Sequence, residues 1–198
     1  MIIVADPQRT DADLAAGRVA CPHCAGRLQA WAYARVRRVR TLEGETLVVR
    51  PRRARCQACA RTQVLRPGAC LPRRADSTEV VGTALLAKAS GRGHRRIAAD
   101  LKRSPSTVRR WLRAARGRHA LGLWHRAVSV LMRLDRETFE QLHRSWVRRL
   151  PGDLGEALLT LDAAVGAARS RFPDLTVPAW SLIGALTAGR LLGAAPGG

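Results

Sequence analysis

Apolar and polar positions divide the chain into a first part with strand-like patterns and a second part with helical ones. Short apolar patches rich in β-forming residues lie at Trp31–Tyr33, Val36, Val39 and Leu47–Val49. A Glu43-Gly44-Glu45 turn stands before the last patch, so this stretch predicts a hairpin. From Ser77 onward, apolar residues recur with helical spacing. The pattern predicts an α+β fold, in which a small β unit is followed by helices only.

Prolines, glycines and changes of pattern divide the 198 residues into five segments. They are a lead-in over 1–18, the β unit over 19–66, a linker over 67–76, a helical unit over 77–118 and a helical C-terminal segment over 119–198. In the last segment, we expect helices over Ala120–Met132, Glu137–Leu150, Leu154–Arg171 and Ala179–Leu192.

Two short helices joined by a tight turn are predicted within the helical unit. The first covers His94–Leu101, and the second begins at Pro105, a residue suited to the first helical position, after the capping residue Ser104. The small residue Ala98 stands where the two helices would cross. This arrangement predicts a helix-turn-helix. The alternative is an ordinary helical hairpin with a solvated basic face.

The second of these helices has an apolar side and a basic side. Val108, Trp111 and Leu112 are expected to point inward. In a DNA major groove, outward arginines would pair with guanine edges or phosphates, and serine or threonine would make short contacts. The candidate DNA-contacting residues of the helix pair are Arg95, Arg96, Ser104, Ser106, Thr107, Arg109, Arg110 and Arg113.

Four cysteines form two Cys-x2-Cys pairs, Cys21 with Cys24 and Cys56 with Cys59, with 31 residues between the pairs. Two such turns, brought together by a hairpin, are typical of a four-thiolate Zn²⁺ site in a zinc ribbon. The alternative is four unrelated cysteines, buried or paired. A shell of four thiolates leaves no open position for water, so we expect a structural metal and no enzyme. The fifth cysteine, Cys70, is expected to be a small buried residue, with a replacement ligand as the alternative.

Positive charge is concentrated in the first two thirds of the chain. Residues 1–126 contain 27 basic and 8 acidic residues, a net charge of +19, whereas residues 127–198 have a net charge of +1. Such a field attracts polyanions, and double-stranded DNA is the expected partner. Arg52, Arg53 and Arg55 of the β unit are expected to contact phosphates. The predominance of arginine over lysine also fits a GC-rich bacterial genome.

No membrane association or export is expected. The basic residues are spread over several elements rather than along one amphipathic face. The apolar run Val177–Ala195 contains Pro178 and Arg190, so we expect a core or partner-facing helix there. The first residues do not form a secretory signal, and we expect a cytoplasmic, nucleoid-associated protein.

The order of these motifs resembles the amino-terminal DNA-binding half of zinc-ribbon insertion-sequence transposases. It resembles more closely a family of short actinobacterial proteins with a zinc ribbon and a helix-turn-helix, often associated with mobile elements. The resemblance covers residues 19–118 and rests on the cysteine pairs, on Leu71-Pro72-Arg73-Arg74, and on the stretches 91–101 and 106–112. It implies the same four zinc ligands and a recognition helix that starts at residues 104–107.

One position departs from that pattern. The turn of such motifs usually has glycine directly after the leucine that ends the first helix, and this chain has Lys102 there. A lysine in a left-handed conformation is less stable than glycine by about 1 kcal/mol. We therefore expect a turn that is slightly different or less stable.

We expect no counterpart of the catalytic domain of such transposases. The acidic residues after Arg126 fall in predicted helices, and 72 residues are too few for a ribonuclease-H-like domain. We therefore expect a non-catalytic DNA-binding protein, either an accessory to transposition or a module derived from a transposase; the alternative is a transcriptional regulator. Residues 119–198 would bind a separate transposase or recombinase catalytic subunit, form a homodimer, or pack on the helix-turn-helix.

Overall fold

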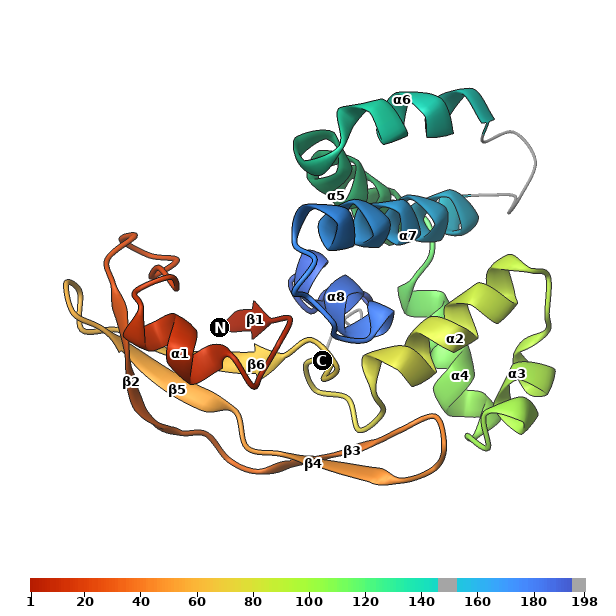
Figure 1. Cartoon of the computed structure of the whole chain (residues 1–198). Helices are drawn as coiled ribbons and strands as arrows, with labels where there is room; N and C mark the ends of the chain where they lie inside the picture. The colour runs from red at the N-terminus through yellow and green to blue at the C-terminus, as the bar shows by residue number, and fades with distance from the viewer. Residues whose placement is uncertain (146–152, 194–198) are drawn as a thin grey trace.

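The computed structural model describes residues 1–145 and 153–193 and shows a mixed α+β fold (Figure 1). Its strands all lie in the first third of the chain, as the sequence pattern predicted. They are β1 (Ile2–Val4), β2 (Leu28–Tyr33), β3 (Arg37–Arg40), β4 (Thr46–Val49), β5 (Arg52–Cys56) and β6 (Thr62–Pro67), with α1 (Thr10–Ala15) after β1. The helices that follow are α2 (Thr78–Ala89), α3 (His94–Asp100), α4 (Pro105–Ala114), α5 (Arg118–Leu134), α6 (Arg136–Ser145), α7 (Asp153–Arg171) and α8 (Ala179–Leu186).

Four strands form the N-terminal sheet, in the order β1-β6-β5-β2. β1 pairs with β6 in parallel, and the other neighbours are antiparallel. Helix α1 covers one face, where Leu14 packs with Leu28, Ala54 and Leu65. Two cysteines, Cys21 and Cys56, belong to the same small apolar cluster. A cluster of this size buries little surface, so a bound ion would add substantially to its stability.

The β3–β4 hairpin, residues 37–49, extends away from the N-terminal sheet and runs beneath the helices toward α3 (Figure 1). Its turn contains Gly44 with φ of 90°, which agrees with the turn predicted at residues 43–45. Val39 is fully buried, whereas Val48 on the partner strand is exposed. The edge of β3 pairs with the segment before α2: Arg40 N donates to Ala75 O and Ser77 N donates to Arg40 O.

Residues 67–76, predicted as a linker, have fixed contacts on both sides. Cys70, Leu71 and Asp76 are buried. Gly68 touches α8 so closely that a Cβ there would overlap the backbone oxygen of Ser181, and a Cβ at Gly184 would overlap Gly68. The Thr78 hydroxyl donates to Gly68 O at 2.6 Å. The sheet and the helices are therefore joined by packed backbone at this point.

The largest hydrophobic core lies among the helices. It combines residues of α2, α3 and α4 with residues from α5, α7, α8 and the chain after α8. Its large members include Leu85, Ile97, Val108, Trp111, Leu123, Leu161, Leu182 and Leu191. Helix α2 begins where Ser77 accepts a hydrogen bond from Val80 N, a standard N-cap.

The C-terminal segment packs on the helical unit within the same chain. Trp124 and Trp180 are half-buried against the large core. Trp146 and the end of the predicted helix Glu137–Leu150 lie outside the described residues. Within the described part of the chain, no helix is long and apolar enough to cross a membrane.

Helix α8 ends at Leu186, earlier than the predicted Leu192. Ala188 and Gly189 both have positive φ, and Gly189 N donates to Gly184 O at 2.7 Å. This is a left-handed C-terminal cap, which satisfies the last carbonyls and stops the helix.

Candidate metal centre and basic helix

The two Cys-x2-Cys pairs form two similar turns that face each other. One turn precedes β2, and the other connects β5 to β6. After each second cysteine stands an alanine in the left-handed region, Ala25 with φ of 56° and Ala60 with φ of 58°. Ala25 N donates to Cys21 O, and Ala60 N donates to Cys56 O. The matching backbone explains why each turn presents both of its sulfurs toward the other turn.

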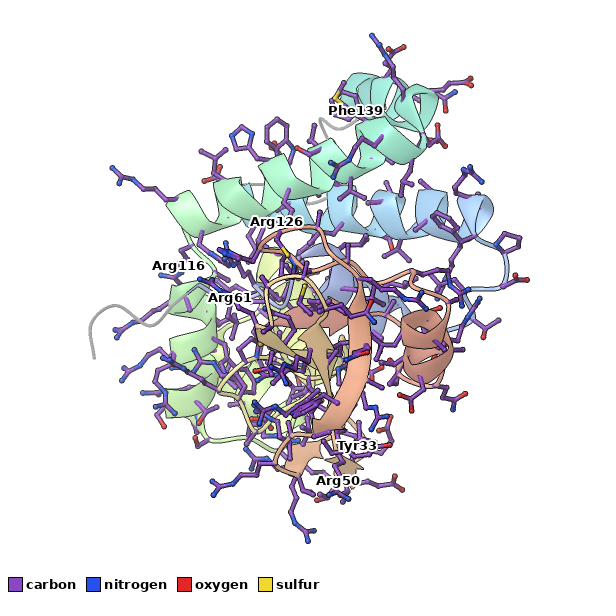
Figure 2. All side chains as sticks on the ribbon, turned by 90° about the vertical axis from the view of Figure 1, so that its left-hand side faces the viewer. Tyr33, Arg50, Arg61, Arg116, Arg126 and Phe139 are labelled. Atoms are coloured by element: carbon purple, nitrogen blue, oxygen red, sulfur yellow. The ribbon has the colours of Figure 1, made fainter. Side chains whose placement is uncertain are left out.

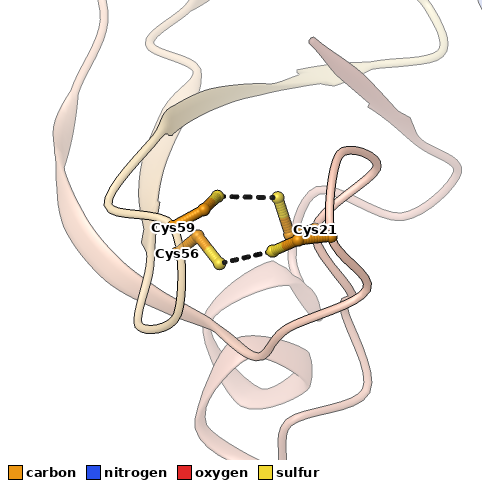
Figure 3. Close-up of side chains that lie close together, drawn as sticks. Cys21, Cys56 and Cys59 are labelled. Atoms are coloured by element: carbon orange, nitrogen blue, oxygen red, sulfur yellow. Dashed lines mark hydrogen bonds between the residues drawn. The ribbon is translucent and has the colours of Figure 1, made fainter.

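The four cysteine sulfurs converge on one point, as Figure 3 shows. All four Sγ atoms lie within 4.8 Å of one another. Cys21 Sγ is 3.8 Å from Cys59 Sγ, and Cys24 Sγ is 3.5 Å from Cys56 Sγ. All five cysteines of the chain are free of disulfide bonds. The predicted grouping of Cys21, Cys24, Cys56 and Cys59 is therefore confirmed, and these residues can hold a metal ion.

Backbone amides and neighbouring thiols set the ionisation of this cluster. The N–H of Cys59, followed by that of Ala58, hydrogen-bonds to Cys56 and lowers its pKa to about 6 against the penalty of burial. A hydrogen bond from the N–H of Gly26 likewise lowers the pKa of Cys24. The Cys59 and Cys56 side chains outweigh it and raise the pKa of Cys24 to about 12. A bound cation would favour the thiolate form of these side chains.

Gly26 is a part of the site that spacing alone did not identify. A Cβ at this position would meet Ala58 Cβ at 2.8 Å and the sulfurs of Cys56 and Cys24 at 3.1 and 3.3 Å. Glycine therefore allows the first turn to approach the second. The signal available in the sequence was a glycine two residues after Cys24.

Two further residues with side chains that can bind metal, His23 and Cys70, lie apart from the cluster. His23 is exposed, and its Nδ1 is 3.1 Å from Arg61 Nη1. Cys70 is buried next to the start of α2, where its backbone pairs with Ser77. Burial raises the pKa of the Cys70 thiol, although Arg37 and Arg66 act in the opposite sense. Neither residue belongs to the metal-binding group found among the described residues.

Helices α3 and α4 are joined by a tight turn at residues 101–104. Lys102 has φ of 52°, the left-handed conformation that glycine adopts most easily. Ser104 then caps α4, because its hydroxyl accepts a hydrogen bond from Thr107 N at 3.3 Å, and Pro105 is the first helical residue. The predicted cap is present, and Lys102 occupies the left-handed position directly after Leu101.

Helix α4 has the predicted division of sides. Val108, Trp111 and Leu112 are buried. The exposed candidates on the helix pair are Arg95, Arg96, Ser104, Ser106, Arg109, Arg110 and Arg113. Thr107 is half-buried, and its hydroxyl accepts hydrogen bonds from Ser104 and Arg110. The polar side of α4 is therefore basic and open to solvent.

The three arginines predicted in the β unit do not share one face. Arg52 lies on the α1 side of the sheet, with its Nε 2.7 Å from Asp11. Arg53 and Arg55 alternate to the opposite side. Arg53 Nη2 donates to Thr62 Oγ1, and Arg55 stacks over the ring of Trp31.

A buried carboxylate, Asp76, connects the β3–β4 hairpin to the turn between α3 and α4. Arg103 Nε donates to Asp76 at 2.6 Å, and both side chains are nearly inaccessible, at 7% and 5% exposure. Arg40 of β3 donates to the other carboxylate oxygen at 3.0 Å. Arg103 Nη2 also donates to Thr41 O at the end of β3. The residue directly before the cap of α4 is thus held by the hairpin.

The chain is similar to a family described as a domain of unknown function, DUF6431, whose model matches residues 21–111. That range begins at the first cysteine of the cluster and ends within α4. No curated protein and no solved structure matches the chain.

Proposed function

We propose that this chain is a zinc-stabilised protein that binds double-stranded DNA and reads its sequence with α4. The supporting observation is the row of exposed arginines, Arg109, Arg110 and Arg113, on a helix whose opposite side is buried. An α-helix fits the major groove, and arginine pairs with guanine edges there. Under this proposal, α3 and α4 are a helix-turn-helix, and the N-terminal sheet with its cysteine turns is a zinc ribbon.

The donor set favours zinc as the metal. A tetrahedral Zn²⁺ with Zn–S distances of about 2.3 Å separates its sulfurs by about 3.8 Å. The two measured separations, 3.5 and 3.8 Å, are close to that value. Four thiolates also fill the coordination shell, so the proposed ion is structural. Its role is to hold β2, β5 and β6 together where the apolar cluster is small.

The metal assignment can be tested with Cys56→Ser. Elemental analysis of the purified wild-type protein should find one zinc per chain, and the variant should lose it together with thermal stability. Cys70→Ser is the matched control, because Cys70 is a buried cysteine outside the cluster. Undiminished zinc in Cys56→Ser would contradict the proposed site.

The DNA-reading role can be tested by selecting bound sequences from a random duplex pool. A common motif should be enriched. On the selected duplex, replacing Arg109, Arg110 or Arg113 by alanine should weaken binding by about 1–3 kcal/mol and relax selectivity. Arg133→Ala removes one exposed charge from α5 and should change little. If the α4 variants behave like Arg133→Ala, α4 is not the reading element.

The biological role proposed for this DNA binding rests on the resemblance to the DNA-binding halves of transposases. Under that reading, the protein assists a separate catalytic subunit in transposition; a transcriptional regulator would use the same surfaces. Location of the selected motif would separate the two. Motifs at the inverted repeats of a mobile element support the first, and motifs at promoters support the second.

A further inference from the structure

One face of the N-terminal sheet carries an exposed tryptophan among arginines. Ala54 and Cys56 point toward α1, so Arg53 and Arg55 point to the opposite side. Trp31 lies on that side too, with Arg55 Cζ 5.0 Å from its ring centroid. We call this surface the open face, and it consists of Gln29, Trp31, Arg53, Arg55 and Thr62. None of these five side chains is acidic.

Trp31 is placed outward by an irregularity in β2. The register between β2 and β5 shifts between Ala30 and Ala32, so Trp31 is an extra residue that β5 does not match. Such a bulge re-aims a side chain. Trp31 remains 55% exposed, whereas Trp111 in the helical core is 2% exposed. The indole ring is therefore outside the core and accessible to a ligand on the open face.

The groups beside Trp31 favour an anionic, planar ligand. Arg55 already stacks over the indole, and the exposed remainder of the ring can take a second planar group. Arg53 Nε is shielded from solvent and has no hydrogen-bond partner among the described residues. The guanidinium groups of Arg53 and Arg55 on this face are suited to binding phosphate oxygens through charge-assisted hydrogen bonds. A nucleotide offers a base and a phosphate together.

The nucleotide must be unpaired to use this surface. In a duplex, the base faces are covered by their neighbours, and the protein meets only base edges and backbone. Aromatic side chains that project from a sheet stack instead on the splayed bases of single strands. The open face is therefore suited to single-stranded nucleic acid, whereas the basic side of α4 is suited to a duplex.

The open face and α4 lie on the same side of the molecule. Figure 2 shows α1 to the right of the sheet and α4 to its left, so the face turned away from α1 looks toward the α4 side. A DNA molecule with a paired part and an unpaired end or flap could contact both surfaces at once. This observation extends the proposed function, but binding to the open face does not depend on it.

We propose that Trp31, with Arg53 and Arg55, forms a binding site for single-stranded nucleic acid, in which a base stacks on Trp31 and the arginines hold phosphates. The site is separate from the zinc ligands and from α4. It gives the protein a preference for DNA that contains unpaired nucleotides.

The test uses the full-length, zinc-loaded protein and a fluorescent oligothymidylate of about 15 nucleotides. Anisotropy should show salt-dependent binding. Trp31→Ala should weaken this binding about five- to 100-fold, the range expected for the loss of one base–aromatic stack. Trp31→Phe should restore part of it, because phenylalanine also stacks. Arg55→Gln should weaken binding and reduce its salt dependence.

Phe172→Ala is the matched control. Phe172 is also exposed, at 52%, and also has an arginine over its ring, with Arg171 Cζ 5.6 Å away. It lies at the end of α7, outside the basic part of the chain, so its loss should leave oligothymidylate binding unchanged. Zinc content and melting temperature of each variant show that the fold is retained.

Three outcomes would overturn this proposal. They are the absence of oligothymidylate binding by the wild type, equal behaviour of Trp31→Ala and Phe172→Ala, and equal loss of duplex and single-strand binding in Trp31→Ala. The last outcome would assign Trp31 to a duplex surface. Binding of the selected duplex, measured in parallel, keeps failure of this site distinct from failure of α4.

Discussion

Removing the Asp76 carboxylate tests how firmly the hairpin is attached to the turn before α4. In Asp76→Ala, the Arg103 guanidinium stays in a site where its side chain is only 7% exposed and loses its counter-charge. Removing one partner of a buried ion pair destabilises a protein by about 3–5 kcal/mol. Arg103 keeps hydrogen bonds to the carbonyls of Leu101, Lys102 and Thr41. We therefore expect Asp76→Ala to lower the free energy of unfolding by about 3 kcal/mol, the lower end of this range.

The second arginine on Asp76 should contribute less. Arg40 is 51% exposed, and pairs of this exposure are worth about 0–1 kcal/mol. A matched control is Asp100→Ala, which removes an ion pair with Arg92 in which both side chains are more than 40% exposed. That variant should lose at most about 1 kcal/mol.

Urea unfolding of the zinc-loaded protein, followed by tryptophan fluorescence, measures these differences. A double-mutant cycle with Arg103→Met isolates the coupling between the two buried side chains. Because domains of this size are stable by about 5–15 kcal/mol, a loss of 3 is easily resolved. If Asp76→Ala and Asp100→Ala were equally mild, the hairpin would be held by backbone pairing alone.

Three other changes have defined outcomes. Gly68→Ala should lower the melting temperature, because its Cβ would overlap α8, whereas Gly122→Ala, with open space around it inside α5, should stabilise the protein by about 0.5–1 kcal/mol. Lys102→Gly should stabilise it by about 1 kcal/mol in urea unfolding, since φ is 52°; no gain would show that the turn is unstrained. Removal of zinc by a chelator should make residues 19–66 sensitive to proteolysis. Acidification should have the same effect, because protons compete with the metal for the thiolates. A rate of proteolysis unchanged by the chelator would contradict a structural metal.

Local rules predicted the parts of the site that depend on neighbouring residues. The spacing of the cysteine pairs was enough to group four sulfurs, because each turn presents two of them and the strands between bring the turns together. Ser104 and Pro105 fixed the start of α4, and periodicity separated its buried from its exposed residues. These features depend on stretches of about a dozen residues.

Features that join distant residues were not predictable from the sequence. The parallel pairing of β1 with β6 brings Ile2 beside Leu65, and no local signal indicates it. The contact between Gly68 and Gly184 makes a proline-rich segment part of the interior, although its composition is typical of a linker. Asp76 and Trp31 likewise gain their surroundings only from tertiary structure.

The core shared by α2, α4, α7 and α8 has a consequence for how this protein is made. The hydrophobic cluster that contains Val108 and Trp111 also contains Leu161 and Leu182, which leave the ribosome later. During synthesis, the cysteine turns can capture metal once β6 has emerged, well before the helical core can close. The helix pair would keep apolar surface exposed until α7 and α8 have left the ribosome. A fragment that ends after α4 is therefore expected to aggregate. We likewise expect that α3 and α4 do not fold stably when they are moved into another protein without α7 and α8.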